Sequence, residues 1–306
     1  MRAAVVGAGI AGVACARALT AGGCEVQVLD RGRVPGGRMA SRRLAGRYVD
    51  LGASYFTVSD DGFRGVVDDW AGRGLARPWT DTFGTVGPGG PGEDKQGPMR
   101  WAAAGGLRSL VADLAGGLSV EQGREVFRVG PGPVVDGVAY DVVALAMPDP
   151  QALRVLDPDD PAARLVAGRE WEPSLALAAG FPERVWSFAG AFVSDHPVLS
   201  WVADDGSRRG DGAPVLVAHS TPAFAAPRLG APDAATGELV AALRGLLHLP
   251  EPTWAQVQRW TWAKPVGTRD APYGLAGAVG LCGDGWGASK VQAAWLSGDA
   301  LGRALR

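Results

Sequence analysis

The chain has few of the side chains from which metal sites and disulfide frameworks are built. Its 306 residues include three cysteines and three histidines. Cys15, Cys24 and Cys282 form no CxxC pair, and the histidines are scattered. We therefore expect no metal site and no disulfide framework, and the low cysteine count is typical of a reducing, cytoplasmic compartment.

Long apolar runs and an excess of one charge are also absent. No apolar stretch approaches the roughly 20 residues that a membrane-spanning helix needs, and glycines interrupt the apolar start at residues 3–6. The 30 basic and 32 acidic residues leave a net charge of −2, without a basic stripe. The sequence therefore predicts neither a membrane segment nor a nucleic-acid partner. With 47% hydrophobic residues the chain can bury a core, and its length is typical of two domains.

The N-terminal segment has the order of elements of a dinucleotide-binding unit. Residues 3–6 form a short apolar run typical of a buried parallel strand, and GAGIAG follows at residues 7–12. A helical pattern over residues 13–21 ends at a Gly-Gly pair, and a second strand over residues 25–30 ends in Asp30. Strand, GxGxxG loop, helix and acid-terminated strand together predict a Rossmann-like unit.

Each glycine of this loop has a physical role in the prediction. Gly7 permits the tight turn, Gly9 lets a pyrophosphate approach the backbone, and Gly12 lets the helix pack against the strand. The free N–H groups of the helix N-terminus would bind the phosphates, and Asp30 would accept hydrogen bonds from ribose hydroxyls. The alternative is a glycine-rich turn without a ligand.

Two further segments favour FAD over NAD. Residues 35–39, PGGRM, place Arg38 where its guanidinium can bind a phosphate, with a basic surface loop as the alternative. Near the C-terminus, an apolar strand at residues 278–282 precedes Gly283 and Asp284, and a helical pattern follows. Asp284 would hold ribityl hydroxyls. The helix N-terminus would face the flavin edge that becomes negative on reduction.

Four stretches resemble the FAD-dependent renalase-like proteins, which belong to the amine-oxidase-type flavoprotein superfamily. These stretches are GAGIAG, PGGRMASRR, DLGASYFT at residues 50–57 and LCGDGWGASKVQAAWLSG at residues 281–298. The resemblance implies an α/β fold (α+β overall), with a Rossmann-like FAD-binding domain and a substrate domain on a mainly antiparallel sheet. The implied bounds are 1–75, 100–150 and 268–306 for the FAD-binding domain, and 76–99 and 151–267 for the substrate domain. Within the latter, the Gly- and Pro-rich stretch 84–97 predicts a mobile surface loop.

The resemblance also implies an activity. Renalase-like enzymes oxidise isomeric dihydronicotinamide dinucleotides by hydride transfer to FAD, and O2 then reoxidises the flavin to give H2O2. Two alternatives stay open: an FAD-dependent amine oxidase or desaturase acting on a small metabolite, and a non-catalytic dinucleotide-binding module. A colourless protein with tightly bound NAD would instead indicate an NAD-dependent dehydrogenase.

The expected cofactor-binding residues come from the motifs and from the resemblance. They are Gly7, Gly9, Ile10, Ala11, Gly12, Asp30, Arg31, Gly37, Arg38, Met39, Gly52, Ala53, Val126, Gly283, Asp284 and Val291. Because Cys282 lies inside a strand, we expect a buried thiol there and a non-covalent flavin rather than a covalent link.

Candidates for the substrate pocket are aromatic. Tyr55 and Phe56 follow the segment that the resemblance places at the flavin, Trp201 precedes two aspartates, and alternation places Trp262 and Lys264 on one face of a strand. Lys264 would hold a water or stabilise an anionic flavin. His219 would act as an acid, a base or a hydrogen-bond donor. The alternatives are core packing for the aromatic residues, solvation for Lys264 and a structural role for His219.

The chain departs from the renalase-like pattern on the substrate side. Ser54 stands where the family has Gln, and Asp204 and Asp205 stand where it has cationic or amide groups. Free carboxylates at this wall would disfavour an anionic dinucleotide, which is the ground for the amine alternative.

Overall fold

The computed structural model describes residues 1–306, and the chain divides into two compact units. Unit 1 comprises Met1–Met39, Arg108–Trp171 and Lys264–Arg306, and unit 2 comprises Ala40–Leu107 and Glu172–Ala263. Each unit is therefore assembled from segments that lie far apart in the sequence.

Unit 1 is built on a six-stranded sheet in the order β18-β19-β12-β1-β2-β9. Its strands are β1 (Arg2–Val6), β2 (Glu25–Asp30), β9 (Ser119–Gln122), β12 (Val142–Leu145), β18 (Gly274–Ala276) and β19 (Val279–Leu281). All neighbours are parallel except β18 and β19. β1 lies between β12 and β2 with four of its five residues buried, as its continuous apolar run predicts.

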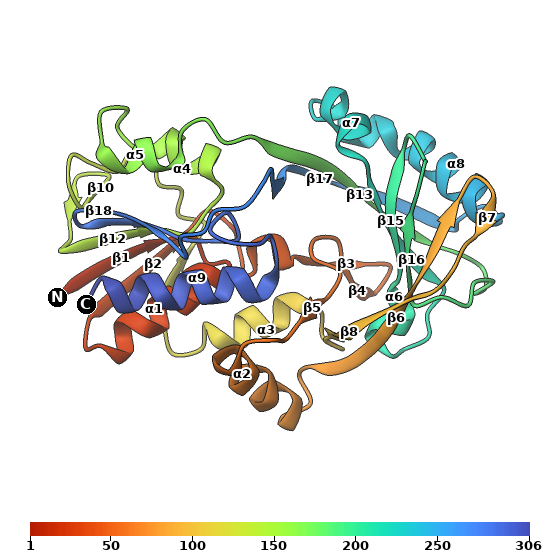
Figure 1. The fold of residues 1–306 in the computed structure, drawn as a ribbon, viewed down its shortest axis with the longest axis horizontal. Helices are drawn as coiled ribbons and strands as arrows, with labels where there is room; N and C mark the ends of the chain where they lie inside the picture. Colours follow the sequence, from red (N-terminus) through yellow and green to blue (C-terminus); the bar gives the residue numbers. More distant parts are fainter. The chain divides into compact units, whose positions relative to one another are not determined.

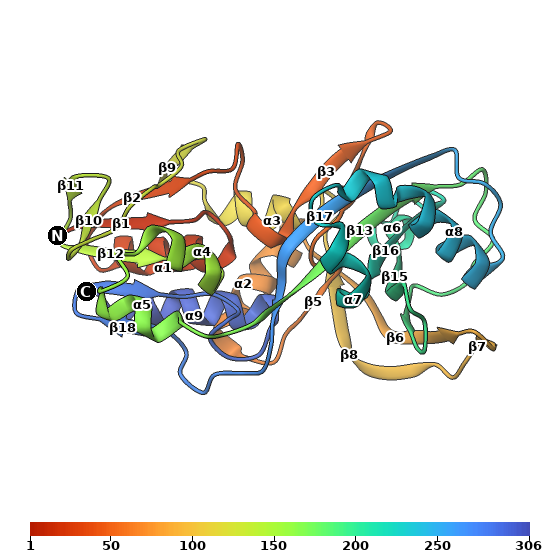
Figure 2. The same cartoon turned by 90° about the horizontal axis from the view of Figure 1, so that it is seen from above.

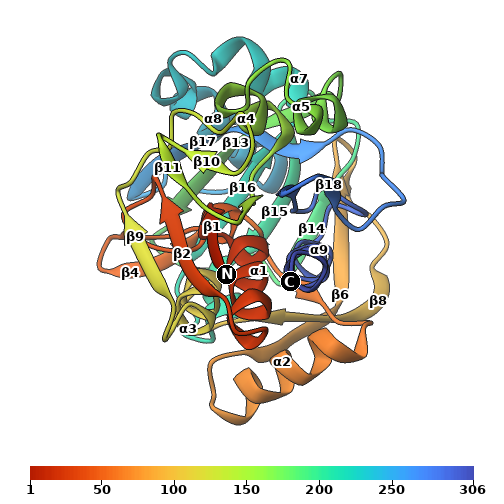
Figure 3. The ribbon, with the colours of Figure 1, turned by 90° about the vertical axis from the view of Figure 1, so that its left-hand side faces the viewer.

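Helices cover both faces of this sheet (Figure 1). One face carries α1 (Ile10–Ala21) and α9 (Val291–Ala304), and the other carries α4 (Asp149–Val155) and α5 (Pro161–Val166). α1 and α9 pack closely because a Cβ at Gly298 or Gly302 would clash with the backbone of α1. Figure 3 shows the two termini of the chain side by side in unit 1. The smaller elements of this unit are η1 (Gly37–Met39), α3 (Leu107–Leu114), β10 (Val134–Val135) and β11 (Val138–Ala139).

Unit 2 is built on a nine-stranded sheet in the order β17-β13-β16-β15-β14-β6-β8-β5, with β7 paired to β6. Its strands are β5 (Phe56–Thr57), β6 (Arg77–Gly87), β7 (Gly90–Pro91), β8 (Lys95–Ala102), β13 (Trp171–Gly180), β14 (Gly190–Val193), β15 (Leu199–Asp204), β16 (Val215–Ser220) and β17 (Trp254–Pro265). β13, β16, β15 and β14 are antiparallel neighbours, and β14 joins β6 in parallel.

One face of the larger sheet is covered by helices. α7 (Pro222–Ala225) and α8 (Thr236–Leu247) share a hydrophobic cluster with β13, β15 and β16, and Figure 1 shows them along these strands. The other elements of unit 2 are β3 (Ser41–Leu44), β4 (Arg47–Asp50), α2 (Asp61–Gly72), α6 (Asp205–Arg209), η2 (Ala226–Arg228) and η3 (Pro232–Ala235).

The prediction of a mobile loop at residues 84–97 is wrong. β6, β7 and β8 extend through most of this stretch and form a long hairpin (Figure 2). β14 pairs with β6 along residues 84–86. The hydrogen bonds between these strands stabilise an extended conformation that the Gly- and Pro-rich composition alone does not favour.

The predicted fold class is confirmed: a Rossmann-like unit is combined with a second unit on a mainly antiparallel sheet. The unit bounds differ from the predicted domain bounds, because residues 40–75 and 100–107 belong to unit 2 and residues 151–171 and 264–267 belong to unit 1. β5 pairs with β8 in the larger sheet, whereas α4 and α5 bury their apolar residues against the smaller one. None of the helices is both long and apolar enough to cross a lipid bilayer.

Candidate functional site

The three glycines of the loop between β1 and α1 differ in what surrounds them. A Cβ at Gly7 would lie 2.5 Å from the carbonyl oxygen of Ala146, and one at Gly12 would overlap the carbonyl oxygen of Gly7. A Cβ at Gly9 would meet only the Cα of Gly37, at 3.9 Å. The fold itself therefore requires Gly7 and Gly12, whereas Gly9 leaves space that a ligand can occupy.

The N-terminus of α1 has the features of an anion site. Gly9 is the N-cap, no side chain caps the helix, and its first turn carries no acidic residue. Ile10 and Ala11 are buried there, and their backbone N–H groups have no hydrogen-bond partner in the chain. Buried, uncapped N–H groups at a helix start are the arrangement that binds phosphate.

Asp30 connects the end of β2 to the glycine loop. Its carboxylate accepts hydrogen bonds from the backbone N–H of Ala8 and from that of Gly32. It thus holds the loop beside the carboxyl ends of the strands, the edge at which this fold binds ligands. Arg31, the next residue, is exposed and lies 3.8 Å from Glu125.

Unit 1 brings both ends of the chain to this loop. Gly36 donates a 2.9 Å hydrogen bond to the carbonyl of Ala8, which joins the PGGRM segment to the glycine loop. Arg38 forms a two-pronged ion pair with Asp284, with 2.8 Å between Nη1 and Oδ2, and Ser289 Oγ donates to the same carboxylate. Segments separated by most of the chain therefore meet at one place.

The other predicted cofactor residues of unit 1 lie in its core or at element ends. Met39 is buried at the end of η1, Gly37 has a φ of +54° within η1, and Val126 belongs to the cluster under α4 and α5. Val291 begins α9, whose N-terminus has no side-chain cap. Cys282 is a buried free thiol, as predicted.

Sequence reasoning missed the arginines that fix the Gly-Asp-Gly segment. Arg169 donates to the carbonyl of Gly285 and, at 2.6 Å, to that of Gly267. Arg269 lies 2.9 Å from the buried Asp149 and stacks over the ring of Trp286 at 4.4 Å. No motif marks these residues, because their partners come from other parts of the chain.

In unit 2, Tyr55 and Trp201 lie in one aromatic cluster. The Tyr55 ring centroid is 5.1 Å from that of Phe83, 5.9 Å from that of Trp201 and 6.3 Å from that of Trp79. Trp201 Nε1 donates a 3.0 Å hydrogen bond to Ser54 Oγ. Burial raises the pKa of the Tyr55 hydroxyl, so this side chain is neutral at physiological pH.

The remaining pocket candidates have different surroundings. Phe56 is buried and packs against Phe63 and Trp70, with centroids 5.9 and 6.2 Å away, which is the core role left open as the alternative. Trp262 is half-buried on β17, and Lys264 is exposed near the end of that strand.

His219 lies opposite Trp201 in the pairing of β15 and β16. Its Nε2 atom is buried without a hydrogen-bond partner in the chain. Burial, together with the positive charge of Arg208, lowers the pKa of His219 to about 4. The imidazole is therefore neutral at physiological pH. It can form a hydrogen bond with a ligand, but it offers the ligand no positive charge.

His219 is expected to make stability fall as the pH drops. Its pKa of about 4 in the folded protein lies below the usual value of an unfolded histidine, so the unfolded chain binds the proton first. The contribution of His219 to the free energy of unfolding should fall by about 3 kcal/mol between about pH 6.5 and pH 4, at about 1.4 kcal/mol per pKa unit. Urea unfolding of the wild type and of His219→Gln over this range measures it. Parallel pH profiles for the two proteins would contradict the assignment.

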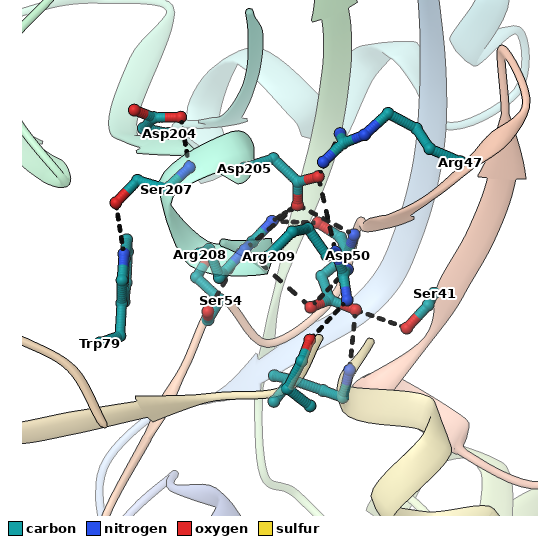
Figure 4. Close-up of polar contacts among 12 residues, drawn as sticks. Ser41, Arg47, Asp50, Ser54, Trp79, Asp204, Asp205, Ser207, Arg208 and Arg209 are labelled. Carbon is teal, nitrogen blue, oxygen red and sulfur yellow. Dashed lines mark hydrogen bonds and ion pairs between the residues drawn. The ribbon is translucent and has the colours of Figure 1, made fainter. Parts of the chain in front are cut away.

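A buried cluster of charged side chains joins α6 to the β3–β4 hairpin of unit 2 (Figure 4). Arg208 Nε donates to Asp205 Oδ1 at 3.2 Å, and Arg209 Nη2 lies 2.7 Å from Asp50 Oδ2. Arg47 Nη1 lies 2.6 Å from Asp205 Oδ2. Arg208, Asp205 and Asp50 have fully buried side chains, so these ions compensate one another out of contact with water.

The predicted negative wall at Asp204 and Asp205 is absent. Asp204 caps α6 through the N–H of Ser207 and pairs with Arg184 at 2.7 Å. Burial on its own would raise the pKa of Asp205, but Arg208 and the other arginines outweigh it and lower that pKa. Both carboxylates are buried and neutralised by arginine, so the expectation that they repel an anionic substrate is wrong.

Comparisons with known proteins agree with this architecture. Residues 5–70 match the NAD(P)-binding Rossmann-like domain family. A protein from Exiguobacterium sp. 255-15, provisionally named a protoporphyrinogen oxidase, has a TM-score of 0.78 at 14% identity, with 99% of this chain and 98% of that chain covered. A double mutant of putrescine oxidase has a TM-score of 0.77 at 15% identity, with 100% and 99% covered.

A third solved structure with this fold is named as an isomerase rather than an oxidase. It is a CLA-producing fatty acid isomerase from P. acnes, with a TM-score of 0.73 at 13% identity and 98% and 97% of the chains covered. Residues 5–70 therefore match a Rossmann-like domain family, and the whole chain shares the fold of these solved structures. At this identity the likeness shows the fold and leaves the reaction to be argued from the residues.

Proposed function

We propose that this protein is an FAD-dependent oxidoreductase that oxidises a small molecule and passes the electrons to O2. The observation that carries the proposal is the meeting in unit 1 of the glycine loop, Arg38 and Asp284. An NAD site needs the glycine loop alone, whereas a longer ligand that reaches the last helix needs the glycine loop, Arg38 and Asp284 together.

The residues present fit an FAD molecule. The space at Gly9 and the uncapped start of α1 suit the pyrophosphate, with Arg38 beside them, and Asp30 suits the adenosine ribose. Asp284 and the start of α9 suit the flavin end. When bound, FAD supplies a hydride acceptor and a route for two electrons to O2, giving H2O2.

We propose further that, within unit 2, Gly52 and Ala53 are cofactor contacts and that the aromatic cluster of Tyr55 and Trp201, together with Trp262, binds the substrate. Aromatic rings suit a planar substrate, and the leading candidate is an isomeric dihydronicotinamide dinucleotide. Such a donor carries its own hydride and needs no protein base. Lys264 is exposed and is proposed only to hold a water near the flavin.

A small amine is the second candidate substrate. Its support is the fold shared with putrescine oxidase, and aromatic rings can also hold an ammonium group. Asp204 and Asp205 give no further support to an amine substrate, because arginine side chains neutralise both carboxylates.

One spectroscopic series tests the function and separates its alternatives. The purified protein, supplied with FAD, should absorb near about 450 nm as any oxidised flavin does. Anaerobic stopped-flow mixing with borohydride-isomerised NADH should bleach this band, and admission of O2 should restore it with formation of H2O2. Bleaching by putrescine or another amine alone would replace the first substrate by the second. Bound flavin that no donor reduces would indicate a non-catalytic module, and a colourless protein would overturn the proposal.

A further inference from the structure

A tight turn in unit 1 follows β19 and leads toward the last helix. The N–H of Trp286 donates a 3.0 Å hydrogen bond to the carbonyl of Gly283, so Asp284 and Gly285 are the central residues of this turn. The N–H of Gly283 donates at 3.0 Å to Ser297 Oγ of α9. All four residues of the turn are buried, yet the backbone N–H groups of Asp284 and Gly285 have no hydrogen-bond partner in the chain.

Two adjacent buried N–H groups without a partner are unusual. More than nine in ten such groups in folded proteins are paired, because an unpaired donor loses its hydrogen bond to water and gains nothing in return. The turn stands at the carboxyl end of β19, the edge of the sheet at which this fold binds ligands. The two N–H groups are therefore suited to electronegative atoms of a ligand.

Arg169 fastens the turn through its carbonyl side. Nη1 of Arg169 donates to the carbonyl of Gly285, Nη2 donates at 2.6 Å to that of Gly267, and Nε donates at 3.1 Å to that of Val266. The N–H of Val266 in turn donates at 3.0 Å to the carbonyl of Glu170. Each guanidinium nitrogen thus bonds a backbone carbonyl, and the turn is tied to a segment that is itself hydrogen-bonded beside Arg169.

The packing around Gly285 leaves the turn little room to move. A Cβ at Gly285 would lie 3.2 Å from the ring of Trp171 and 3.6 Å from Nη1 of Arg169. Arg38 lies over the same Trp171 ring, 5.2 Å from its centroid, and also pairs with Asp284. One arginine therefore holds the carbonyl of Gly285 and another the carboxylate of Asp284, while the N–H groups between them stay free.

A lysine cannot replace Arg169 in this arrangement. The guanidinium is a planar fork whose donors point in fixed directions, so it reaches the turn and the segment at residues 266–267 together. An ammonium group keeps the charge but is a single point donor on a flexible stem.

We propose that Arg169 is a positioning residue that holds the Gly283–Trp286 turn in the conformation in which the N–H groups of Asp284 and Gly285 bind the flavin end of FAD. This inference rests on the proposed function. Arg169 touches neither flavin nor substrate in this scheme and acts through the carbonyl of Gly285. All the residues involved belong to unit 1.

Arg17 offers a matched control for the loss of an arginine that bonds a carbonyl. It lies on α1 in the same unit, and its Nη1 donates at 3.1 Å to the carbonyl of Leu114 at the end of α3. Its removal therefore deletes a guanidinium–carbonyl bond of unit 1 without loosening the turn.

The test compares the wild type with Arg169→Lys, Arg169→Met and Arg17→Met. Titrations of each apoprotein with FAD and with ADP, the visible spectrum of the bound flavin and thermal unfolding are measured. Arg169→Lys should fold and bind FAD about tenfold more weakly, the loss expected for one charge-assisted hydrogen bond, with a changed flavin spectrum. Its affinity for ADP, which carries only the adenosine and pyrophosphate part of FAD, should equal that of the wild type. Arg17→Met should lose thermal stability yet keep FAD affinity within about twofold.

Failure of the function and failure of the positioning role give different results. If the wild type binds no FAD, the proposed function falls, and with it the ligand assigned to the turn. If the wild type binds FAD and Arg169→Lys matches it in affinity and spectrum, only the positioning role is overturned. Equal losses of FAD affinity in Arg169→Lys and Arg17→Met, or an equal loss for ADP, would reject the role as an effect of stability. Should Arg169→Met fail to fold, Arg169→Lys decides, and if neither folds the residue is structural and the proposal is wrong.

Discussion

Gly9→Ala is expected to fold normally and to bind FAD about 5- to 150-fold more weakly than the wild type. The added methyl group meets only the Cα of Gly37 at 3.9 Å, an ordinary van der Waals distance, so the protein itself has room for it. A pyrophosphate that approaches the backbone at Gly9 needs the same space. Overpacking of this kind costs about 1–3 kcal/mol, which corresponds to a roughly 5- to 150-fold loss of affinity.

Gly12→Ala is the matched control for this prediction. Its Cβ would overlap the carbonyl oxygen of Gly7 and lie 3.0 Å from the Cβ of Ala146, so the loop must distort even without a ligand. The free energy of unfolding should fall by about 3 kcal/mol or more in the apoprotein. Thermal unfolding and fluorescence titration with FAD measure both variants. A Gly9→Ala protein that binds FAD like the wild type would place the phosphates elsewhere.

Asp284→Asn is expected to weaken FAD binding by about tenfold or more and to destabilise unit 1. The Asp284 side chain is only 12% exposed and is held by Arg38 and Ser289. The amide keeps the size of the side chain but loses the charge that Arg38 pairs with, and it accepts hydrogen bonds from hydroxyls less strongly. The loss of one charge-assisted interaction is about 1.5–3 kcal/mol.

Asp299→Asn controls for the loss of an ion pair as such. Asp299 pairs with Arg303 at 2.7 Å between Oδ2 and Nε within α9, the same helix whose start is assigned to the flavin; Arg303 is exposed and Asp299 is half-buried. FAD titration and the visible spectrum should show no change for this variant, since Asp299 lies eight residues after Val291, where α9 begins, and its ion pair with Arg303 is made within the helix. If Asp284→Asn also keeps the wild-type affinity and spectrum, the C-terminal segment does not bind the flavin.

Local sequence was sufficient to predict the start of the fold. The run of residues 3–6, Gly12 and Asp30 act through neighbours within one βαβ unit, and the structure places each in the expected element. The requirement at Gly12 can be read from spacing, because its Cβ would meet the carbonyl of Gly7. The requirement at Gly7 comes instead from Ala146, far along the chain. The fold class followed from the order of such elements.

Composition was a poor guide where pairing with distant strands decides the conformation. The Gly- and Pro-rich residues 84–97 had the composition of a loop, yet β6 runs into this stretch with β14 beside it. Asp204 and Asp205 suggested an exposed acidic patch, yet both side chains are buried at the start of α6. In both cases hydrogen bonds and ion pairs from elsewhere outweigh local preference.

The sequence by itself determined the Rossmann-like unit, the elements in which its glycines and Asp30 lie, and a fold with a second sheet. Only the tertiary structure decided which buried charges neutralise each other and which turn they hold. Arg208 and Ser54 lie 154 residues apart, and Arg38 and Asp284 lie 246 apart. The difference is physical: a backbone turn depends on adjacent residues, whereas the field around a buried charge depends on whichever segments the folded chain brings within a few ångströms.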